Sequence, residues 1–155
     1  MADAKTTELS VVTATGTVAD GPVRSVTIPT TDGEITVLPD HVPLVSVIRP
    51  GVLTIRTGKD GADEQHLAVS GGFLKVSGDS ISVLADTAER ADDIDRQRAE
   101  QARKRAEQAM AGKLEREELA EAQAELQKHL ARLRAVELAG TRRRGRGGRS
   151  QTPGS

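Results

Sequence analysis

The sequence predicts an α+β protein: an N-terminal all-β sandwich, then a C-terminal antiparallel two-helix hairpin and a disordered Arg-rich tail. Residues 1–88 hold 30 Val, Ile and Thr, whereas residues 89–139 hold two, and such β-branched side chains suit strands. The second segment instead holds 12 Ala and is rich in Glu, Arg, Gln and Leu, which are strong helix formers. We therefore divide the 155 residues into a β-domain over 1–88, a helical segment over 89–139 and a tail over 140–155.

Within residues 1–88, short apolar or alternating runs are separated by residues that favour turns. Pro29, Pro39 and Pro50 each follow such a run and end it. A chain of about this length buries one small core, and the regular spacing of short runs is typical of a sandwich or barrel. We expect strands over residues 9–14, 23–28, 34–38, 44–48, 52–56, 65–70, 73–77 and 80–84.

From residue 89 the apolar spacing becomes helical. Gly112 divides the segment into helices over about 89–111 and 114–138, because Gly commonly ends a helix. The second helix carries one apolar stripe, made of Leu119, Ala122, Leu126, Leu130, Leu133 and Val136. The first carries a thinner stripe of Ala91, Ala99, Ala102, Ala106 and Ala109. We expect a hairpin that is marginal by itself and docks weakly.

Charge is unevenly distributed along the chain. Residues 1–88 carry 6 Lys and Arg against 11 Asp and Glu, residues 89–139 carry 11 against 12, and residues 140–155 carry five Arg and no acid. The last segment is of low complexity, and we expect it to be disordered. Its arginines suit nucleic acid or anionic lipid, but no aromatic residue interleaves with them to stack on bases. We therefore favour a solubilising tail and no nucleic-acid partner.

Several function classes are excluded or disfavoured by residue type. There is no Cys, so disulfides, thiolate metal sites and a Cys nucleophile are excluded. The three His are scattered along the chain, which disfavours a His-based metal cluster. The two glycine-rich motifs that bind phosphate, G-x-x-x-x-G-K-[ST] and G-x-G-x-x-G, are both absent. Ser70-Gly71-Gly72 is read as a bend between strands. No apolar run approaches the 18 or so residues that span a bilayer, and residues 1–10 lack a signal-peptide pattern; we expect a location on the cytoplasmic side.

The helical segment offers the main candidate for ligand chemistry. On a helical wheel Asp95 lies near the middle of the alanine stripe, with Arg98 and Arg105 on one flank. Lys128 and Arg132 are i,i+4 neighbours on the second helix. Basic groups converging from two helices would clamp an anion such as a nucleotide phosphate. The alternative is that Asp95 favours the positive end of the helix and pairs with Arg98; spacing alone favours that alternative.

Five strings carry a resemblance to a known family. The order and spacing of these strings, over about residues 8–138, resemble the epsilon subunit of bacterial F-type ATP synthase. The tail beyond residue 139 is not part of the family pattern. The strings are SVTIP (25–29), DGEITVLPDHVPL (32–44), RPGVL (49–53), AVSGGFL (68–74) and VLADTAER (83–90).

The resemblance implies a sandwich of about ten strands at the foot of the rotating central stalk of a proton-transporting synthase. It implies a non-catalytic role, with the gamma subunit and the ring of c subunits as partners and a peripheral position on the cytoplasmic face of the cell membrane. In such proteins the loop matching residues 32–41 faces the ring, so Glu34 and His41 are the candidates for ring contact. Asp40 stands where Gly is usual, so we expect an altered turn.

The resemblance also implies a regulatory hairpin, folded on the sandwich in one state. In an extended state it contacts the alpha/beta catalytic head and blocks hydrolysis. Basic residues of the second helix, Arg132 and Arg134, would then attract acidic surfaces. No cofactor is implied as required, but some members bind a regulatory ATP through the motif [IL]-D-x-x-R-A, here residues 94–99. The corresponding positions are Glu89, Ile94, Asp95, Arg98, Ala99, Arg105, Lys128 and Arg132, with Lys128 standing where those members have Arg.

Two other function classes stay open from the residues alone. A free adaptor, made of a β-domain with a helical arm, would share this composition. The two classes differ in their binding partners, because an adaptor would not co-purify with gamma and the catalytic subunits. A stand-alone enzyme is disfavoured, because the catalytic residue constellations are absent.

Overall fold

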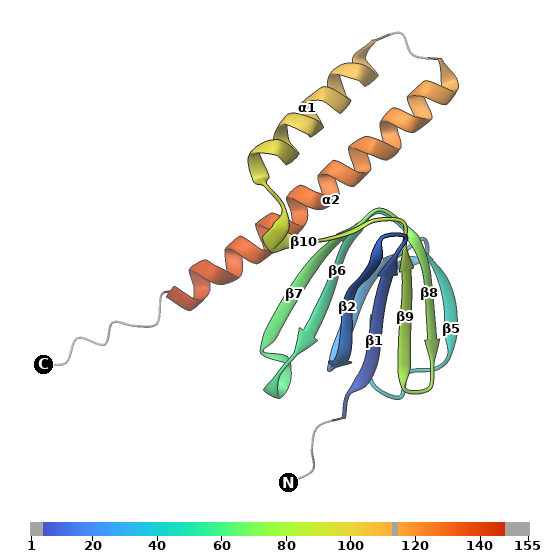
Figure 1. The fold of residues 1–155 in the computed structure, drawn as a ribbon, viewed down its shortest axis with the longest axis vertical. Helices are drawn as coiled ribbons and strands as arrows, with labels where there is room; N and C mark the ends of the chain where they lie inside the picture. The colour runs from blue at the N-terminus through green and yellow to red at the C-terminus, as the bar shows by residue number, and fades with distance from the viewer. Residues whose placement is uncertain (1–4, 113–114, 148–155) are drawn as a thin grey trace, which may run out of the picture.

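The computed structural model describes residues 5–112 and 115–147, which form a ten-stranded sandwich and a helical hairpin (Figure 1). The strands are β1 (Thr7–Thr13), β2 (Gly16–Val23), β3 (Ser25–Thr30), β4 (Gly33–Val37), β5 (Leu44–Ile48), β6 (Gly51–Thr57), β7 (Asp63–Val69), β8 (Gly72–Ser77), β9 (Ser80–Ala85) and β10 (Ala88–Arg90). The helices are α1 (Arg96–Ala111) and α2 (Arg116–Gly147), with short 3₁₀ turns η1 (Lys59–Gly61) and η2 (Ala91–Asp93).

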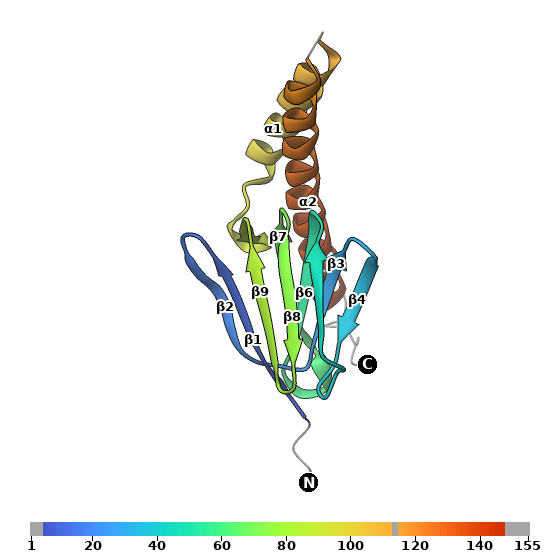
Figure 2. The same cartoon turned by 90° about the vertical axis from the view of Figure 1, so that its right-hand side faces the viewer.

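The strands form one continuous path that folds into two layers. Their order is β10-β7-β6-β3-β5-β8-β9-β1-β2, and β4 pairs with the free side of β3. The path turns from one layer to the other between β3 and β5, which share one residue pair, Thr30 with Ile48. All pairings are antiparallel except β1 with β9. Figure 2 shows the layer of β1, β9 and β8 in front of the layer of β7, β6 and β3.

Side-chain alternation places the core between the layers. In β8 and β9 every second residue is buried, as the period of a strand requires. The largest fully buried core side chains are Ile28, Leu53, Leu67, Leu74 and Ile81. In β7 four consecutive residues, 66–69, are buried, because the outer face of this strand lies under α2. We call the buried residues between the layers the sandwich core.

The eight predicted strands are confirmed, with small shifts at their ends, and two strands were missed. β2 contains Asp20, Gly21 and Pro22, which read as a turn in the sequence. The strand tolerates them because it lies at one end of the strand path. β10 is three residues long and pairs Glu89 with Ala68. It was missed because it is too short to show alternation.

The segment Ser70-Gly71-Gly72 links β7 to β8, as predicted. Gly72 has φ +134, and a Cβ at this position would collide with the Leu84 carbonyl oxygen of β9. Glycine is therefore required by close approach of two backbones and by a left-handed φ.

The first helix begins seven residues later than predicted, which corrects the boundary at residue 88/89. Ala88 to Arg90 extend the sheet, and η2 follows. Asp95 lies outside the helix, at its N-cap: its Oδ1 accepts hydrogen bonds from the backbone N–H of Gln97 (3.0 Å) and Arg98 (3.3 Å). The position of Asp95 in the middle of the alanine stripe is wrong, and the alternative, a favourable place at the helix N-terminus, is confirmed.

The second helix is longer than predicted. Gly112 is the C-cap of α1, as expected, but α2 runs to Gly147. The expected tail boundary at residue 140 is therefore corrected: residues 140–147 continue the helix, and residues 148–155 lie outside the described residues. A helix of 32 residues is about 48 Å long. Arg is a good helix former, and the Thr141 hydroxyl donates to the Glu137 carbonyl oxygen at 2.9 Å.

The hairpin projects from the sandwich, and only the C-terminal half of α2 lies against it (Figure 1). This half of α2 packs on the outer face of β6 and β7. The contact is made by a second apolar cluster, which we call the docking cluster: Ala68, Ala91, Ile94, Ala99, Ala131 and Ala135. Five of its six members are alanines, and the half-buried Val52, Leu133, Val136 and Ala139 pack against it. Weak docking stays a prediction.

Candidate functional site

Two of the residues proposed to bind a nucleotide, Glu89 and Arg132, meet where β10, η2 and α2 come together. The guanidinium of Arg132 on α2 donates through Nε to Oε2 of Glu89 on β10, at 2.6 Å. The Arg132 side chain is 20 % exposed and that of Glu89 is 39 % exposed. A pocket of about 420 Å³ opens beside this ion pair. Its lining is Val18, Ala88, Glu89, Arg90, Asp93 and Arg132.

The motif at residues 94–99 spans the entry into α1. Ile94 and Ala99 are buried in the docking cluster. Asp95 is occupied as the helix cap, and Arg98 lies 4.0 Å from its carboxylate with a side chain that is 84 % exposed. The motif therefore has two apolar members that anchor α1 and one arginine that extends into solvent.

The other two candidates are not brought into direct contact with the pocket. Lys128 is half-buried on α2, one turn before Arg132, and Arg105 is exposed on α1. Neither lines the pocket beside Glu89. The structure thus joins Glu89 with Arg132 and Ile94 with Ala99, and it leaves Arg98 and Arg105 on the solvent side of α1.

His129 lies in the interface between α1 and α2, which we call the seam, and this position was not predicted. The half-buried residues of α2 at 119, 122, 126, 129, 133 and 136 recur at alternating steps of three and four, which is the pattern of a helix–helix seam. Leu130, assigned to that stripe, is instead 39 % exposed. The spacing in the sequence could have identified this position, because His129 lies one heptad from both Ala122 and Val136. A single polar residue among apolar ones concealed it.

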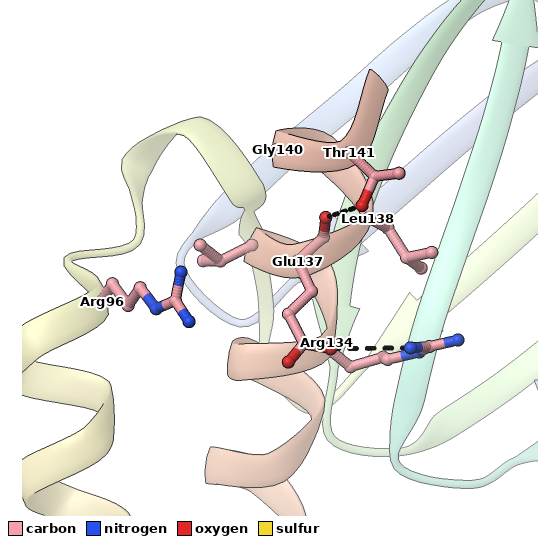
Figure 3. A pocket seen from close by; sticks show the side chains of 7 residues that line it. Arg96, Arg134, Glu137, Leu138, Gly140 and Thr141 are labelled. Atoms are coloured by element: carbon pink, nitrogen blue, oxygen red, sulfur yellow. Dashed lines mark hydrogen bonds and ion pairs between the residues drawn. The ribbon is translucent and has the colours of Figure 1, made fainter. Parts of the chain in front are cut away.

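A second pocket lies on the other side of α2, shown in Figure 3. It has a volume of about 350 Å³ and is lined by Arg96, Arg134, Val136, Glu137, Leu138, Gly140 and Thr141. Arg96 comes from the start of α1 and the other residues come from α2. Arg134 lies 3.5 Å from the Glu137 carboxylate on its own helix, and its side chain is 65 % exposed. Arg134 is therefore available to a partner, whereas Arg132 is already paired.

The two residues expected to contact the ring lie apart. Glu34 is exposed near the start of β4 and lines a groove with Arg49 and Arg134. His41 is half-buried in the loop after β4, and its Nδ1 lies 2.7 Å from the Val42 carbonyl oxygen. Because the length of β4 separates them, one partner surface would have to be extended to reach both.

The turn at Asp40 keeps a glycine-like conformation. Asp40 has φ 61, in the left-handed region that Gly adopts readily and Asp tolerates better than most residues. Its Oδ2 also accepts a hydrogen bond from the Lys5 ammonium at 2.7 Å. The φ angle of Asp40 is therefore one that Gly would also adopt, and it gives no support for the altered turn.

The outer face of the other sandwich layer carries a row of four apolar side chains, of which Val12 is half-buried and the other three are exposed. Val12, Leu84, Phe73 and Val47 are direct neighbours across β1, β9, β8 and β5. The side chains of Phe73 and Leu84 are 59 % exposed, and Val47 is 45 % exposed. We call these four residues the apolar row. The sequence concealed the row, because strand pairing rather than chain order brings its members together.

The described residues hold no group of three or more His, Asp or Glu that could bind a metal ion. Within the same ranges, no helix is both long and apolar enough to cross a membrane.

Comparison with known proteins gives a family match over both parts of the chain. The beta-sandwich domain of the ATP synthase delta/epsilon chain matches residues 6–91, and the long alpha-helix domain of that chain matches residues 92–137. An ATP synthase epsilon chain of Acidithiobacillus ferridurans is 43 % identical over 134 residues, covering 86 % of this chain and 93 % of the relative. An ATP synthase epsilon chain 2 of Ralstonia nicotianae is 42 % identical over 136 residues, covering 88 % and 96 %.

Solved structures agree with this match at the level of the fold. A chain in the mitochondrial ATP synthase of Euglena gracilis superposes with a TM-score of 0.69 at 22 % identity, covering 84 % of this chain and 79 % of that one. A chain in the central stalk and c-ring structure of the Tetrahymena thermophila mitochondrial ATP synthase gives a TM-score of 0.55 at 16 % identity, covering 83 % and 95 %.

Proposed function

The chain belongs to the ATP synthase delta/epsilon chain family, and from that premise we propose that it is a non-catalytic subunit of the central stalk. In this role the sandwich joins the gamma subunit to the c-subunit ring, so that ion flow through the ring turns the shaft. The hairpin regulates ATP hydrolysis. The chain is placed peripherally, on the cytoplasmic face of the membrane, through its complex.

The apolar row carries the proposal. A monomeric domain rarely exposes neighbouring large apolar residues in a continuous patch unless a partner covers them. The row lies on the layer opposite to the one covered by α2, so the chain's own helices do not cover it. Phe73 is the sole aromatic residue of the chain, and aromatic side chains are common anchors of interfaces. We assign this face to the gamma subunit.

The coupling role is tested by assembling the synthase with a Phe73→Ala/Leu84→Ala double variant. Both side chains are already largely exposed, so the fold should persist while the affinity for gamma falls at least tenfold. Thr36→Ala, on the exposed side of β4, is the matched control. Retention of the double variant on gamma at the wild-type affinity would refute the assignment. Failure of the wild type to co-purify with gamma would favour a free adaptor.

The regulatory role of the hairpin is supported by how little of it is docked. Only the C-terminal half of α2 lies on the sandwich (Figure 2), through the docking cluster of small side chains. An element held by few apolar contacts can occupy two arrangements that differ by a few kcal/mol. Arg134 is exposed and available for attraction to acidic surfaces of the alpha/beta head when the hairpin extends.

Truncation tests this role, and the structure defines where to cut. A chain ending at Ala88 would remove most of β10, so the variant should end at Arg90, which keeps the pairing of Glu89 with Ala68. Purified synthase carrying this variant should hydrolyse ATP faster than synthase carrying the full chain. Equal hydrolysis rates would mean that the hairpin is not a brake.

We further propose that the folded hairpin binds a regulatory ATP at the pocket beside Glu89 and Arg132. The proposal is supported by Arg132, which lines the pocket, and by a second cation, Lys128, which lies one turn earlier on the same helix. Phosphate oxygens would compete with the Glu89 carboxylate for Arg132. ATP at 100 times its dissociation constant would favour the folded hairpin by about 2.7 kcal/mol.

Calorimetric titration of the full chain with ATP tests this site. Heat of binding should appear at or below millimolar ATP, and Arg132→Ala should weaken binding at least tenfold. Arg49→Ala, a basic residue outside the pocket, is the control. The site is refuted if millimolar ATP gives no heat. Ring contact by Glu34 and His41 stays a separate proposal, to be tested by crosslinking each to the c-ring.

A further inference from the structure

His129 occupies an apolar position in the seam between the two helices. Its side chain is 14 % exposed, and it stands one heptad from Ala122 and one heptad from Val136. The facing helix α1 presents small residues to this seam, among them the fully buried Ala99. A titratable imidazole therefore takes the place of an alkyl side chain in the hairpin interface.

The imidazole is incompletely partnered. Its Nδ1 is buried and has no hydrogen-bond partner among the described residues. Its Nε2 lies 3.5 Å from the carboxylate of Glu125, which is one turn earlier on α2 and 61 % exposed. A carboxylate so open to water compensates a nearby charge weakly. A proton on Nδ1 would consequently be placed in the seam without an acceptor.

The charged groups around His129 act on its proton in both directions, and Glu125, which favours the proton, is opposed by two cations of α2. Lys128 and Arg132 flank it on α2, and Glu89 approaches from β10 but is bound to Arg132. On α1 the half-buried charged residues are Glu100 and Arg103; Nε of Arg103 is buried without a hydrogen-bond partner, and its Nη1 lies 3.7 Å from the Glu107 carboxylate. Lys128 and Arg132 thus oppose a proton on His129, Glu125 alone favours one at short range, and Glu89 is already bound to Arg132.

The direction of titration follows from this environment. Burial is the largest influence, and it lowers the pKa of His129 below its ordinary value near 6.5. In an open hairpin the ring would be solvated, and its pKa would return towards 6.5. The open form therefore binds the proton more tightly, and hairpin stability is lost as pH falls through about 6.5 and below.

We propose that His129 is a pH-sensitive latch of the helical hairpin: neutral imidazole permits the closed seam, and its protonation opens α1 from α2. The latch is a property of the chain itself and does not depend on the proposed role in the synthase. If that role holds, acidification of the surrounding solution would release the helices from the folded state.

The other two histidines provide the contrast. His66 is buried under α2, but its Nδ1 is hydrogen-bonded to the Thr54 hydroxyl at 3.1 Å and its Nε2 lies 3.5 Å from Glu64. A proton on His66 would meet a less exposed carboxylate, 26 % exposed against 61 % for Glu125. His41 lies in the loop after β4, outside the hairpin. His129 is therefore the position at which replacement should abolish the response.

Amide hydrogen exchange of the full-length chain, corrected for intrinsic exchange rates and measured between pH 5.5 and 8, tests the latch. The opening equilibrium of α1 and of the N-terminal half of α2 should rise at least threefold on acidification. His129→Gln, which stays neutral, should flatten this dependence, and His41→Gln should retain it. His129→Leu, which restores an alkyl seam residue, should also be flat.

Two results would overturn the latch. One is a wild-type hairpin whose opening does not change with pH. The other is a pH dependence that persists at wild-type size in both His129→Gln and His129→Leu, which would assign the response to another group. Folding of each variant is checked by the exchange protection of β8 and β9, which lie in the layer away from α2.

Discussion

The two apolar clusters of this chain are built from different side chains and hold their parts together with different strength. The sandwich core is made of Val, Ile and Leu, many of them fully buried. The docking cluster is made of alanines and one isoleucine, Ile94. Each buried methylene contributes about 0.8 kcal/mol, so an alanine contributes much less than a leucine. Less free energy therefore holds the hairpin on the sandwich than holds the two layers of the sandwich together.

The difference matches the two roles proposed for these parts. A rotor part that transmits torque must not deform, and close-packed interiors resist deformation. A regulatory arm must leave its docking surface without unfolding the domain below it. Small side chains on both surfaces allow close approach when docked, and they expose little apolar area when released. The ion pair between Glu89 and Arg132 joins two side chains that water can solvate when the interface opens.

The largest expected effect comes from breaking the sandwich core. Leu67→Ala removes a fully buried side chain from β7 and should lower the free energy of unfolding by about 2–5 kcal/mol, through lost transfer energy and the cavity left behind. The measurement is urea unfolding followed by circular dichroism, because the chain has no Trp or Tyr for fluorescence.

Leu84→Ala is the matched control, since it removes the same atoms from a side chain that is 59 % exposed. Its effect on stability should stay within about 0.5 kcal/mol. Equal losses in the two variants would mean that burial does not distinguish the sandwich core from the apolar row.

A smaller effect is expected from overfilling the docking cluster. Ala135→Leu inserts three carbon atoms at a fully buried position on α2, and overpacking of this kind costs about 1–3 kcal/mol. The cost should fall on docking and spare the sandwich. Exchange protection should therefore drop in α2 and persist in β8 and β9. Ala120→Leu, at an exposed position of the same helix, is the control; loss of protection in both regions of Ala135→Leu would mean that hairpin and sandwich unfold together.

The sequence predicted the parts of this molecule that depend on local pattern. Alternation and turn residues identified eight strands, and the change to alanine-rich composition identified the helices. β10 was too short to alternate, and its place depends on pairing with Leu67 and Ala68, which are distant in the chain. The same reason concealed the apolar row.

The members of the nucleotide site stay a prediction, and the structure brings only some of them together. The pairing of Glu89 with Arg132 joins residues 43 positions apart, and neither the resemblance nor the spacing predicted this ion pair. Asp95 was placed wrongly, because a wheel drawn from residue 89 assumes a helix where the chain forms β10 and η2. The polar seam residue His129 was overlooked, because the stripe was traced through apolar residues alone.

The smallest expected effect comes from removing the N-cap of α1. It tests whether the hairpin can lose stability while the sandwich keeps its own. Asp95→Ala removes the acceptor of two backbone hydrogen bonds and should destabilise α1 by about 1 kcal/mol. Asp95→Asn keeps a capping oxygen and loses the charge, so it should cost only a few tenths of a kcal/mol.

Amide exchange in α1 is the measurement for this pair, and its pattern decides the question. If the hairpin is an independent unit, Asp95→Ala should raise exchange at Ala99 and Ala102 and leave Leu74 and Ile81 in the sandwich core unchanged. If Leu74 and Ile81 also exchange faster by the same free energy, the cap stabilises the whole chain. The hairpin would then not be a separately switching element. An equal effect of Asp95→Asn would instead attribute the stabilisation to the carboxylate charge rather than to the cap.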